Sequence, residues 1–151
     1  YIADCAGVNG MVGGQCIDLN NEGQVIDRFI LHQMHAKKTG ALIRAACVGG
    51  AMLGTDDQSV LSVVEEYAKQ LGLAFQIVDD ILDVEGDVSQ LGKRTGMDAQ
   101  QGKNPFVSVY GLQTAKELAA THTQRAMELL HRLPHSEFLT FCTKFLLKRN
   151  Y

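Results

Sequence analysis

The stretch DQSVLSVVEEYAKQLGLAFQIVDDILDVE, residues 57–85, decides the fold class of this 151-residue sequence. Its apolar residues recur at spacings of three and four, the period of an α-helix, and Asp56, Asp57 and Ser59 offer a cap for its start. The same spacing continues through most of the chain, and no strand-like alternation is sustained. We therefore expect an all-α protein, with helices over residues 1–19, 26–36, 39–53, 57–85, 105–110, 112–132 and 136–148.

The composition excludes several classes of protein. With 46% hydrophobic and 21% charged residues, the chain has the make-up of a globular domain and not of a disordered one. A formal net charge of −3 lacks the basic footprint of a nucleic-acid binder. Cysteines are isolated and no apolar run is long enough to cross a membrane, so we expect reduced thiols and a cytoplasmic protein. The sequence opens inside a helical pattern, so we expect it to be part of a longer chain.

The segment FQIVDDILDVEGD, residues 75–87, is acidic and contains no basic residue. On a helix, Asp79, Asp80 and Asp83 share one sector with Gln76, while apolar side chains occupy most of the remaining surface. A helix that is apolar on most sides is buried, so this sector is expected to face an internal cavity or another chain. Two interpretations remain open here. The carboxylates bind a hard cation such as Mg²⁺, or they pair with Lys and Arg of a neighbouring helix.

Basic residues precede and follow this acidic segment. Lys38 and Thr39 are expected at a helix N-terminus, where free N–H groups and the helix dipole favour an anion. Lys93 and Lys103 each follow a glycine in the irregular stretch 86–104. Neither Gly-Lys pair has the spacing of a Walker A loop, and no G-x-G-x-x-G occurs, so nucleotide-binding classes have little support. Together, the acidic sector and the lysines have the composition of a Mg²⁺-dependent diphosphate site.

The order of these motifs carries a resemblance to a known family. The motifs are KTG (38–40), FQ-x-x-DD-x-x-D (75–83), GD (86–87), LGK (91–93) and D-x-x-x-GK (98–103), preceded by a GGQ-x-x-D that ends at Asp18. This combination resembles the C-terminal half of the trans-isoprenyl diphosphate synthases, and within them most closely the bacterial farnesyl diphosphate synthases (geranyltranstransferases). The resemblance covers nearly the whole chain, so residues 1–151 are interpreted as the C-terminal part of a single synthase domain.

The resemblance implies an antiparallel helical bundle around a central cavity, here an incomplete portion of it, in a homodimer. It implies Mg²⁺-dependent condensation of isopentenyl diphosphate with dimethylallyl or geranyl diphosphate to a short-chain product, farnesyl diphosphate. Up to three Mg²⁺ ions would be shared with a first aspartate motif that belongs to the family's N-terminal half and is absent here. By the same resemblance, the catalytic residues are Lys38, Thr39 and Gln76, the substrate-binding residues are Lys38, Lys93, Lys103 and Arg149, and the metal ligands are Asp79, Asp80 and Asp83.

Several alternatives remain open at this point. The product could be geranylgeranyl or a longer polyprenyl diphosphate, or the chain could be a non-catalytic helical partner of such an enzyme. A terpene cyclase shares the helical architecture, but its usual second motif is an Asn/Ser/Glu triad where this sequence has Asp. His32 and His35 lie three apart but have no third ligand nearby, so we assign them to surface or core positions. Because the first motif is absent, we expect the 151 residues alone not to catalyse condensation.

Overall fold

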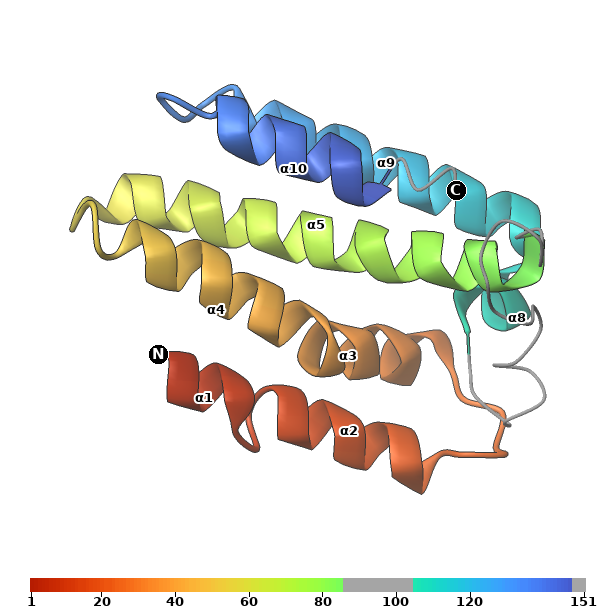
Figure 1. The fold of residues 1–151 in the computed structure, drawn as a ribbon. Helices are drawn as coiled ribbons and strands as arrows, with labels where there is room; N and C mark the ends of the chain where they lie inside the picture. Colours follow the sequence, from red (N-terminus) through yellow and green to blue (C-terminus); the bar gives the residue numbers. More distant parts are fainter. Residues whose placement is uncertain (86–104, 148–151) are drawn as a thin grey trace.

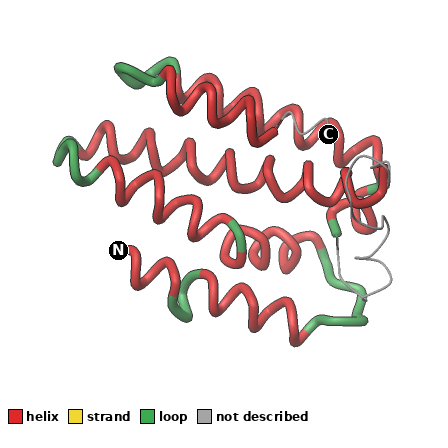
Figure 2. The backbone as a smooth tube through the Cα atoms, in the orientation of Figure 1, coloured by secondary structure: helices red, strands yellow, loops and turns green. Residues whose placement is uncertain are grey.

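The structure is a computed structural model that describes residues 1–85 and 105–147. These residues form helices and loops, and none of them lies in a strand (Figure 2). The helices are α1 (Ile2–Ala6), α2 (Met11–Asn20), α3 (Arg28–Lys38), α4 (Gly40–Ala51), α5 (Gln58–Glu85), α8 (Phe106–Tyr110), α9 (Leu112–Leu130) and α10 (Glu137–Leu147).

The helices lie in antiparallel rows (Figure 1). One row consists of α1 and α2, and the next consists of α3 and α4, which run back in the opposite direction. The long helix α5 packs against this second row and, on its other side, against α9 and α10. The short helix α8 lies against α5 and α9, near the C-terminal end of α5. The expectation of an all-α antiparallel arrangement is confirmed.

Helix α5 is the centre of two apolar clusters. Its N-terminal half places Tyr67 and Leu71 against Ala126 and Leu130 of α9. Its C-terminal half packs Ile77 with residues of α3, α8 and α9, among them Leu31, Met34, Phe106 and Ala115. The helix starts where the sequence indicates, because the Asp57 carboxylate accepts the backbone N–H of Ser59 at 2.8 Å.

The predicted helix over residues 1–19 is wrong, because the chain breaks into α1 and α2. The break contains Gly7, which is extended, and Gly10, where an added Cβ would lie 1.8 Å from the carbonyl oxygen of Cys5. Glycine tolerates this close approach, and it is also a poor helix former. The other helices are found within a few residues of their expected limits.

Two further observations concern the cysteines and the hydropathy of the described residues. All four cysteines are free, without a disulfide. No helix within residues 1–85 or 105–147 combines the length and the hydropathy needed to cross a membrane.

Candidate functional site

The break between α3 and α4 at Thr39 is approached by glycines of two other helices. An added Cβ at Gly14 of α2 would lie 2.1 Å from the backbone nitrogen of Lys38, and one at Gly72 of α5 would lie 3.0 Å from the Cα of Gly40. Helices α2 and α5 therefore pack directly on the backbone of the α3–α4 break. A larger residue in place of either glycine would prevent this contact. This junction of helices positions the candidate site.

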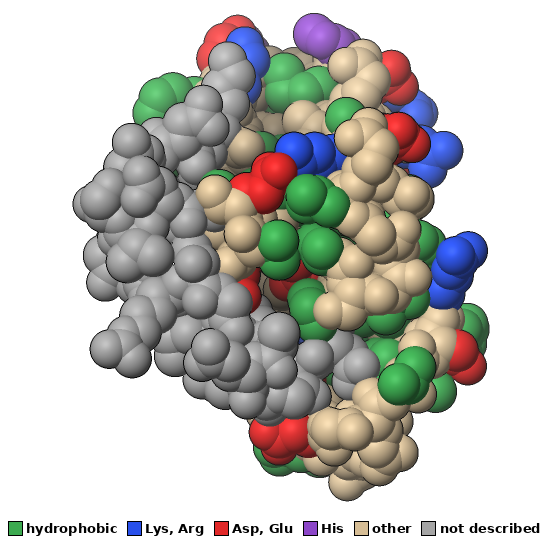
Figure 3. All heavy atoms as spheres, turned by 90° about the vertical axis from the view of Figure 1, so that its right-hand side faces the viewer, with side chains coloured by type: hydrophobic (Ala, Val, Ile, Leu, Met, Phe, Trp, Pro, Cys, Tyr) green, Lys and Arg blue, Asp and Glu red, His purple; other side chains and the backbone are tan. Residues whose placement is uncertain are grey.

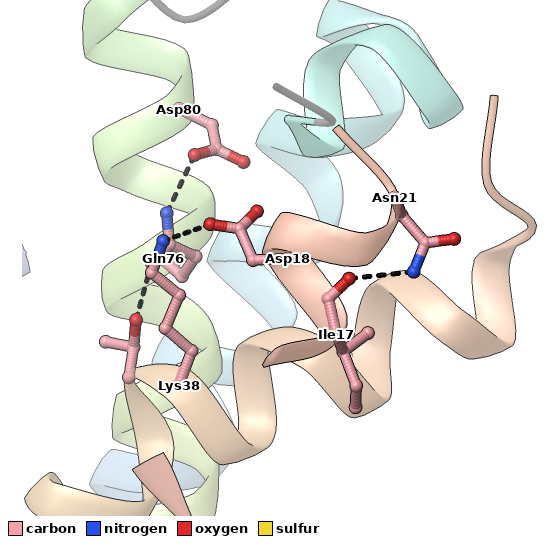
Figure 4. Close-up of polar contacts among 7 residues, drawn as sticks. Ile17, Asp18, Asn21, Lys38, Gln76 and Asp80 are labelled. Atoms are coloured by element: carbon pink, nitrogen blue, oxygen red, sulfur yellow. Dashed lines mark hydrogen bonds and ion pairs between the residues drawn. The ribbon is translucent and has the colours of Figure 1, made fainter. Parts of the chain in front are cut away.

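Each of these glycines is followed, one helical turn later, by a polar residue on the same face. Four positions after Gly14, Asp18 accepts a 2.5 Å hydrogen bond from the Lys38 ammonium. Four positions after Gly72, Gln76 accepts a 2.9 Å hydrogen bond from the Thr39 hydroxyl through its Oε1. The close helix approach therefore brings both pairs within hydrogen-bond distance (Figure 4).

The expected helix start at Thr39 is confirmed, because Thr39 is the residue that precedes α4 as its N-cap. The expectation that Lys38 also belongs to this N-terminus is wrong. Lys38 is the last residue of α3, and the Thr39 N–H donates to the His35 carbonyl at 3.1 Å, so helix hydrogen bonds continue up to the break. The Thr39 hydroxyl bonds to Gln76 instead of capping α4. Lys38 and Thr39 therefore contribute to the candidate site through their side chains and not through free backbone N–H groups.

A chain of hydrogen bonds runs from this junction along α5 to α8. Gln76 donates through its Nε2 to Oδ1 of Asp80 at 2.8 Å, and the backbone N–H of Phe106 donates to Oδ2 of Asp80 at 2.7 Å. With the Thr39 hydroxyl, these bonds connect the α3–α4 break, α5 and the first residue of α8. The amide of Gln76 is thereby oriented, with its oxygen toward Thr39 and its nitrogen toward Asp80.

The three aspartates of the acidic segment differ in their environments. Asp80 is only 2% exposed, Asp83 is half-buried and Asp79 is exposed. The expectation of a sector that faces the interior is confirmed for Asp80, whereas Asp79 is exposed within this chain, and a cavity or second chain facing Asp79 stays a prediction. Figure 3 shows charged side chains among hydrophobic ones on this end of the molecule.

The donor chemistry of Asp79 and Asp83 fits a hard cation. Both offer carboxylate oxygens four positions apart on one helix, and Mg²⁺ in proteins commonly takes one or two carboxylates and completes its shell with water and phosphate oxygens. Within residues 1–85 and 105–147, no three His, Cys, Asp or Glu side chains come together as a metal cluster. The two carboxylates match the number that Mg²⁺ commonly takes from a protein.

Comparison with known proteins assigns the family. A sequence model described as polyprenyl synthetase matches residues 6–137. The chain belongs to the polyprenyl synthetase family. The family uses Mg²⁺ held by aspartate-rich motifs.

Curated relatives in this family include farnesyl diphosphate synthases. That of Escherichia coli is 44% identical over 133 residues, which are 87% of this chain and 44% of that protein. That of Micrococcus luteus is 35% identical over 152 residues, or 99% of this chain and 52% of that protein. The chain thus spans about half the length of the curated relatives it matches, and it matches their C-terminal portion.

Solved structures show the same fold. The geranyltransferase of Helicobacter pylori, complexed with magnesium and isoprenyl diphosphate, aligns with a TM-score of 0.81 and 32% identity over 97% of this chain and 48% of its own. The geranylgeranyl pyrophosphate synthetase of Pyrococcus horikoshii aligns with a TM-score of 0.86 and 25% identity over 94% of this chain and 56% of its own. The arrangement of helices is therefore that of isoprenyl synthases.

The candidate residues of this polyprenyl synthetase chain fall into two groups. Lys38, Thr39, Gln76 and the three aspartates lie on α3, α5 and the break between α3 and α4, and the structure brings the first three together with Asp80. The remaining candidates lie outside the described residues, and their roles stay predictions: Lys93, Lys103 and Arg149.

Sequence reasoning missed an aromatic cluster beside the junction. The Phe106 ring is stacked on His35 with ring centroids 5.1 Å apart, and His32 meets the same ring edge-on. His32 also shares a 2.8 Å hydrogen bond with the Tyr110 hydroxyl, while Arg28 lies over the Tyr110 ring. Burial lowers the pKa of the His32 imidazole. The assignment of both histidines to core or surface positions agrees with these contacts.

Asp18 was also missed as a functional candidate. Its signal was present in the GGQ-x-x-D motif, but nothing in that motif indicates a partner for it. The partner is Lys38, which lies 20 positions away on another helix.

Proposed function

We propose that the protein containing this chain is a Mg²⁺-dependent prenyltransferase. It joins isopentenyl diphosphate to dimethylallyl or geranyl diphosphate and yields farnesyl diphosphate. One observation carries the proposal: in a polyprenyl synthetase chain, Lys38, Thr39 and Gln76 converge where α2, α3, α4 and α5 meet, one turn before the aspartates of α5. Relatives of 35–44% identity that are farnesyl diphosphate synthases support it.

Lys38 binds the allylic diphosphate in this proposal. Its side chain is 33% exposed and is held by Asp18, which is 17% exposed, so the cation is both oriented and accessible. A fixed cation beside the leaving diphosphate stabilises the negative charge that develops there as the bond to carbon breaks. Lys93, Lys103 and Arg149 are proposed to bind substrate as well.

Thr39 and Gln76 act on the allylic carbon chain. The Gln76 amide is held at both ends, by Thr39 and by Asp80, so its carbonyl dipole keeps one orientation during the reaction. Oxygens placed in advance near a developing carbocation stabilise it without reorganising. Neither residue forms a covalent bond with substrate.

Asp79 and Asp83 are the carboxylates that we assign to Mg²⁺. Bound Mg²⁺ would supply positive charge to the diphosphate oxygens and favour their departure. The third aspartate of the motif, Asp80, is considered separately below. We further propose that residues 1–151 are the C-terminal part of one synthase domain in a homodimer, and that the remaining metal ligands come from the part of the domain that precedes this segment in the relatives.

Turnover by the full-length protein tests this function. Incubated with isopentenyl and geranyl diphosphates and Mg²⁺, it should form farnesyl diphosphate, identified by mass spectrometry, and EDTA should abolish the reaction. The isolated 151 residues should show no turnover. A product of 20 or more carbons would show that the enzyme is a longer-chain synthase and not a farnesyl diphosphate synthase. If the protein shows neither turnover nor Mg²⁺-dependent binding of a non-reactive bisphosphonate, a non-catalytic subunit is favoured.

A further inference from the structure

Asp80 stands apart from its neighbours in the acidic segment. Its carboxylate is buried, and both oxygens accept hydrogen bonds from the protein itself, one from Gln76 and one from the Phe106 backbone. Asp79, the adjacent residue, is exposed. Two residues of identical chemistry in one motif therefore occupy very different surroundings.

We propose that Asp80 is a positioning residue that clamps Gln76 and the start of α8, whereas the adjacent Asp79 keeps the cation-binding role assigned to it above. The clamp stands on its own contacts, while its effect on the reaction rests on the prenyltransferase function proposed above. The arrangement is three consecutive hydrogen bonds of 2.7–2.9 Å: Thr39 to Gln76, Gln76 to Asp80, and Phe106 to Asp80.

Only a carboxylate at position 80 satisfies both donors and keeps Gln76 in its orientation. The Gln76 amide nitrogen and the Phe106 backbone nitrogen are both donors, and an ionised Asp offers an acceptor oxygen to each. An amide at position 80 would present one oxygen and one NH₂ group, so the Gln76 amide would have to turn around to meet that NH₂ group. The Thr39 hydroxyl would then lose its oxygen acceptor. The bond pattern therefore explains why a charged group is kept inside the protein, since a buried donor without an acceptor is costly.

The clamp also determines where the aromatic cluster lies. Pro105 has no N–H, so the Phe106 N–H is the first donor of α8, and a short helix cannot satisfy it internally. Asp80 accepts that bond and thereby fixes the residue whose ring stacks on His35 of α3. Phe106 is fully buried, so displacing it would disturb α3 and α5 together.

Three variants separate the two parts of the clamp. Asp80→Leu has a side chain of similar size and removes both acceptors. Asp80→Asn keeps an acceptor for Phe106 but turns the Gln76 amide around. The double variant, Gln76→Glu with Asp80→Asn, exchanges the amide and the carboxylate. The new amide at position 80 donates to the new carboxylate at position 76 and accepts from the Phe106 N–H. The new carboxylate still accepts from the Thr39 hydroxyl. The double variant has the formal charge of wild type, so it is the matched control.

The Phe106 amide can be observed selectively. Pro105–Phe106 is the only Pro-Phe pair in these 151 residues, so ¹³C-carbonyl proline with ¹⁵N-phenylalanine labels no other amide of this segment, and loss of the signal in Phe106→Leu identifies it in the full-length protein. In the full-length protein, Asp80→Leu should exchange the Phe106 amide hydrogen about tenfold faster than wild type, and the double variant should exchange it near the wild-type rate. Unchanged exchange in Asp80→Leu overturns the clamp. If Asp80→Leu does not fold, the double variant decides the question. It is expected to fold and to exchange the Phe106 amide hydrogen slowly, and a double variant that does not fold or that exchanges this hydrogen fast counts against the clamp.

Mg²⁺-dependent binding of a non-reactive bisphosphonate separates positioning from ligation. Asp80→Asn should keep the affinity within about threefold of wild type but lower kcat, because it acts through the orientation of Gln76. Asp79→Asn, the same chemical change at the adjacent residue, should weaken binding about tenfold or more. Equal losses of affinity in both variants would make Asp80 a ligand and overturn the proposal. If wild type binds no bisphosphonate, the prenyltransferase function fails, while Phe106 exchange still decides the clamp.

Discussion

The two halves of α5 stabilise the same helix by different means. The N-terminal half contacts α9 and α10 through Tyr67 and Leu71, and its buried polar contact is a neutral one, the 2.8 Å hydrogen bond between the Tyr67 and Thr143 hydroxyls. The C-terminal half contacts the α3–α4 break and α8 through Gln76 and the buried carboxylate of Asp80. Both halves pack in apolar clusters, but only the second also orients the side chains of the candidate site.

This difference has a thermodynamic meaning. Burying a neutral hydroxyl pair costs little once both groups are bonded, whereas burying a carboxylate is costly unless several donors compensate it. Burial raises the pKa of the Tyr67 hydroxyl to about 12, so it stays neutral at any physiological pH. In the other half, the Asp80 carboxylate is compensated by the Gln76 amide and the Phe106 N–H. Four measurements would break or sharpen this comparison.

The largest effect is expected from Gly14→Ala at the junction. The new Cβ would lie 2.1 Å from the Lys38 backbone nitrogen, and backbone cannot move aside as a side chain can. We expect a loss of about 3 kcal/mol in the free energy of unfolding, measured with urea. Gly50→Ala in α4 is the matched control, since no atom lies within 4 Å of its added Cβ, and it should gain up to about 1 kcal/mol. Equal effects of the two variants would refute the close approach of α2.

Lys38→Gln addresses the polar half directly. Loss of a charge-assisted contact to a diphosphate should weaken Mg²⁺-dependent bisphosphonate binding by about 10- to 100-fold, or about 1.5–3 kcal/mol, as measured by titration calorimetry of the full-length protein. Lys37→Gln, one residue earlier on α3, is the control and should bind as wild type does. Stability should change by less than about 1 kcal/mol, because the Asp18–Lys38 pair is partly exposed. Similar binding by the two variants would remove Lys38 from the site.

The neutral pair of the other half should respond asymmetrically. The Thr143 hydroxyl also bonds to the Leu139 carbonyl at 2.8 Å, so Tyr67→Phe leaves it a partner and should cost about 1 kcal/mol of unfolding free energy. Thr143→Val leaves the buried Tyr67 hydroxyl without this partner and should cost about 2 kcal/mol. Neither variant should alter bisphosphonate binding. A large change in binding would show that the two halves are not separable.

The smallest effect concerns pH and His32. Burial lowers the pKa of His32 below its usual 6.5, so the unfolded chain binds the proton more readily than the folded one. Stability from this group is therefore present above pH 6.5 and is lost as the pH falls toward the lower folded-state pKa. The melting temperature should fall between about pH 7.5 and pH 5, and less steeply in His32→Gln.

His122 contributes in the same direction, because burial and then Arg125 lower its pKa. The double variant of His32 and His122 to Gln should therefore show the flattest pH dependence of the three proteins. A steeper dependence in either variant would contradict the assigned sign.

Particular residues show how far the sequence could be interpreted. The helix over 57–85 was predictable because its apolar period and its Asp57 cap are local signals, and the structure has α5 at Gln58–Glu85. The break at Gly7–Gly10 was missed because apolar spacing continues on both sides of it. The exposure of Asp79 and the burial of Asp80 were not predictable. The residues of a helix do not indicate which of its side chains a neighbouring helix will cover.

By itself, the sequence determined the all-α class, the family resemblance and the residue types of the site, because helical period and motif spacing are properties of neighbouring positions along one chain. Only the tertiary structure decided which groups meet. Glycines at positions 14 and 72 let two helices reach the α3–α4 break, and this approach pairs Asp18 with Lys38 and Gln76 with Thr39. Such pairs depend on the distance between helices, which arises when apolar faces pack and backbone comes into contact with backbone.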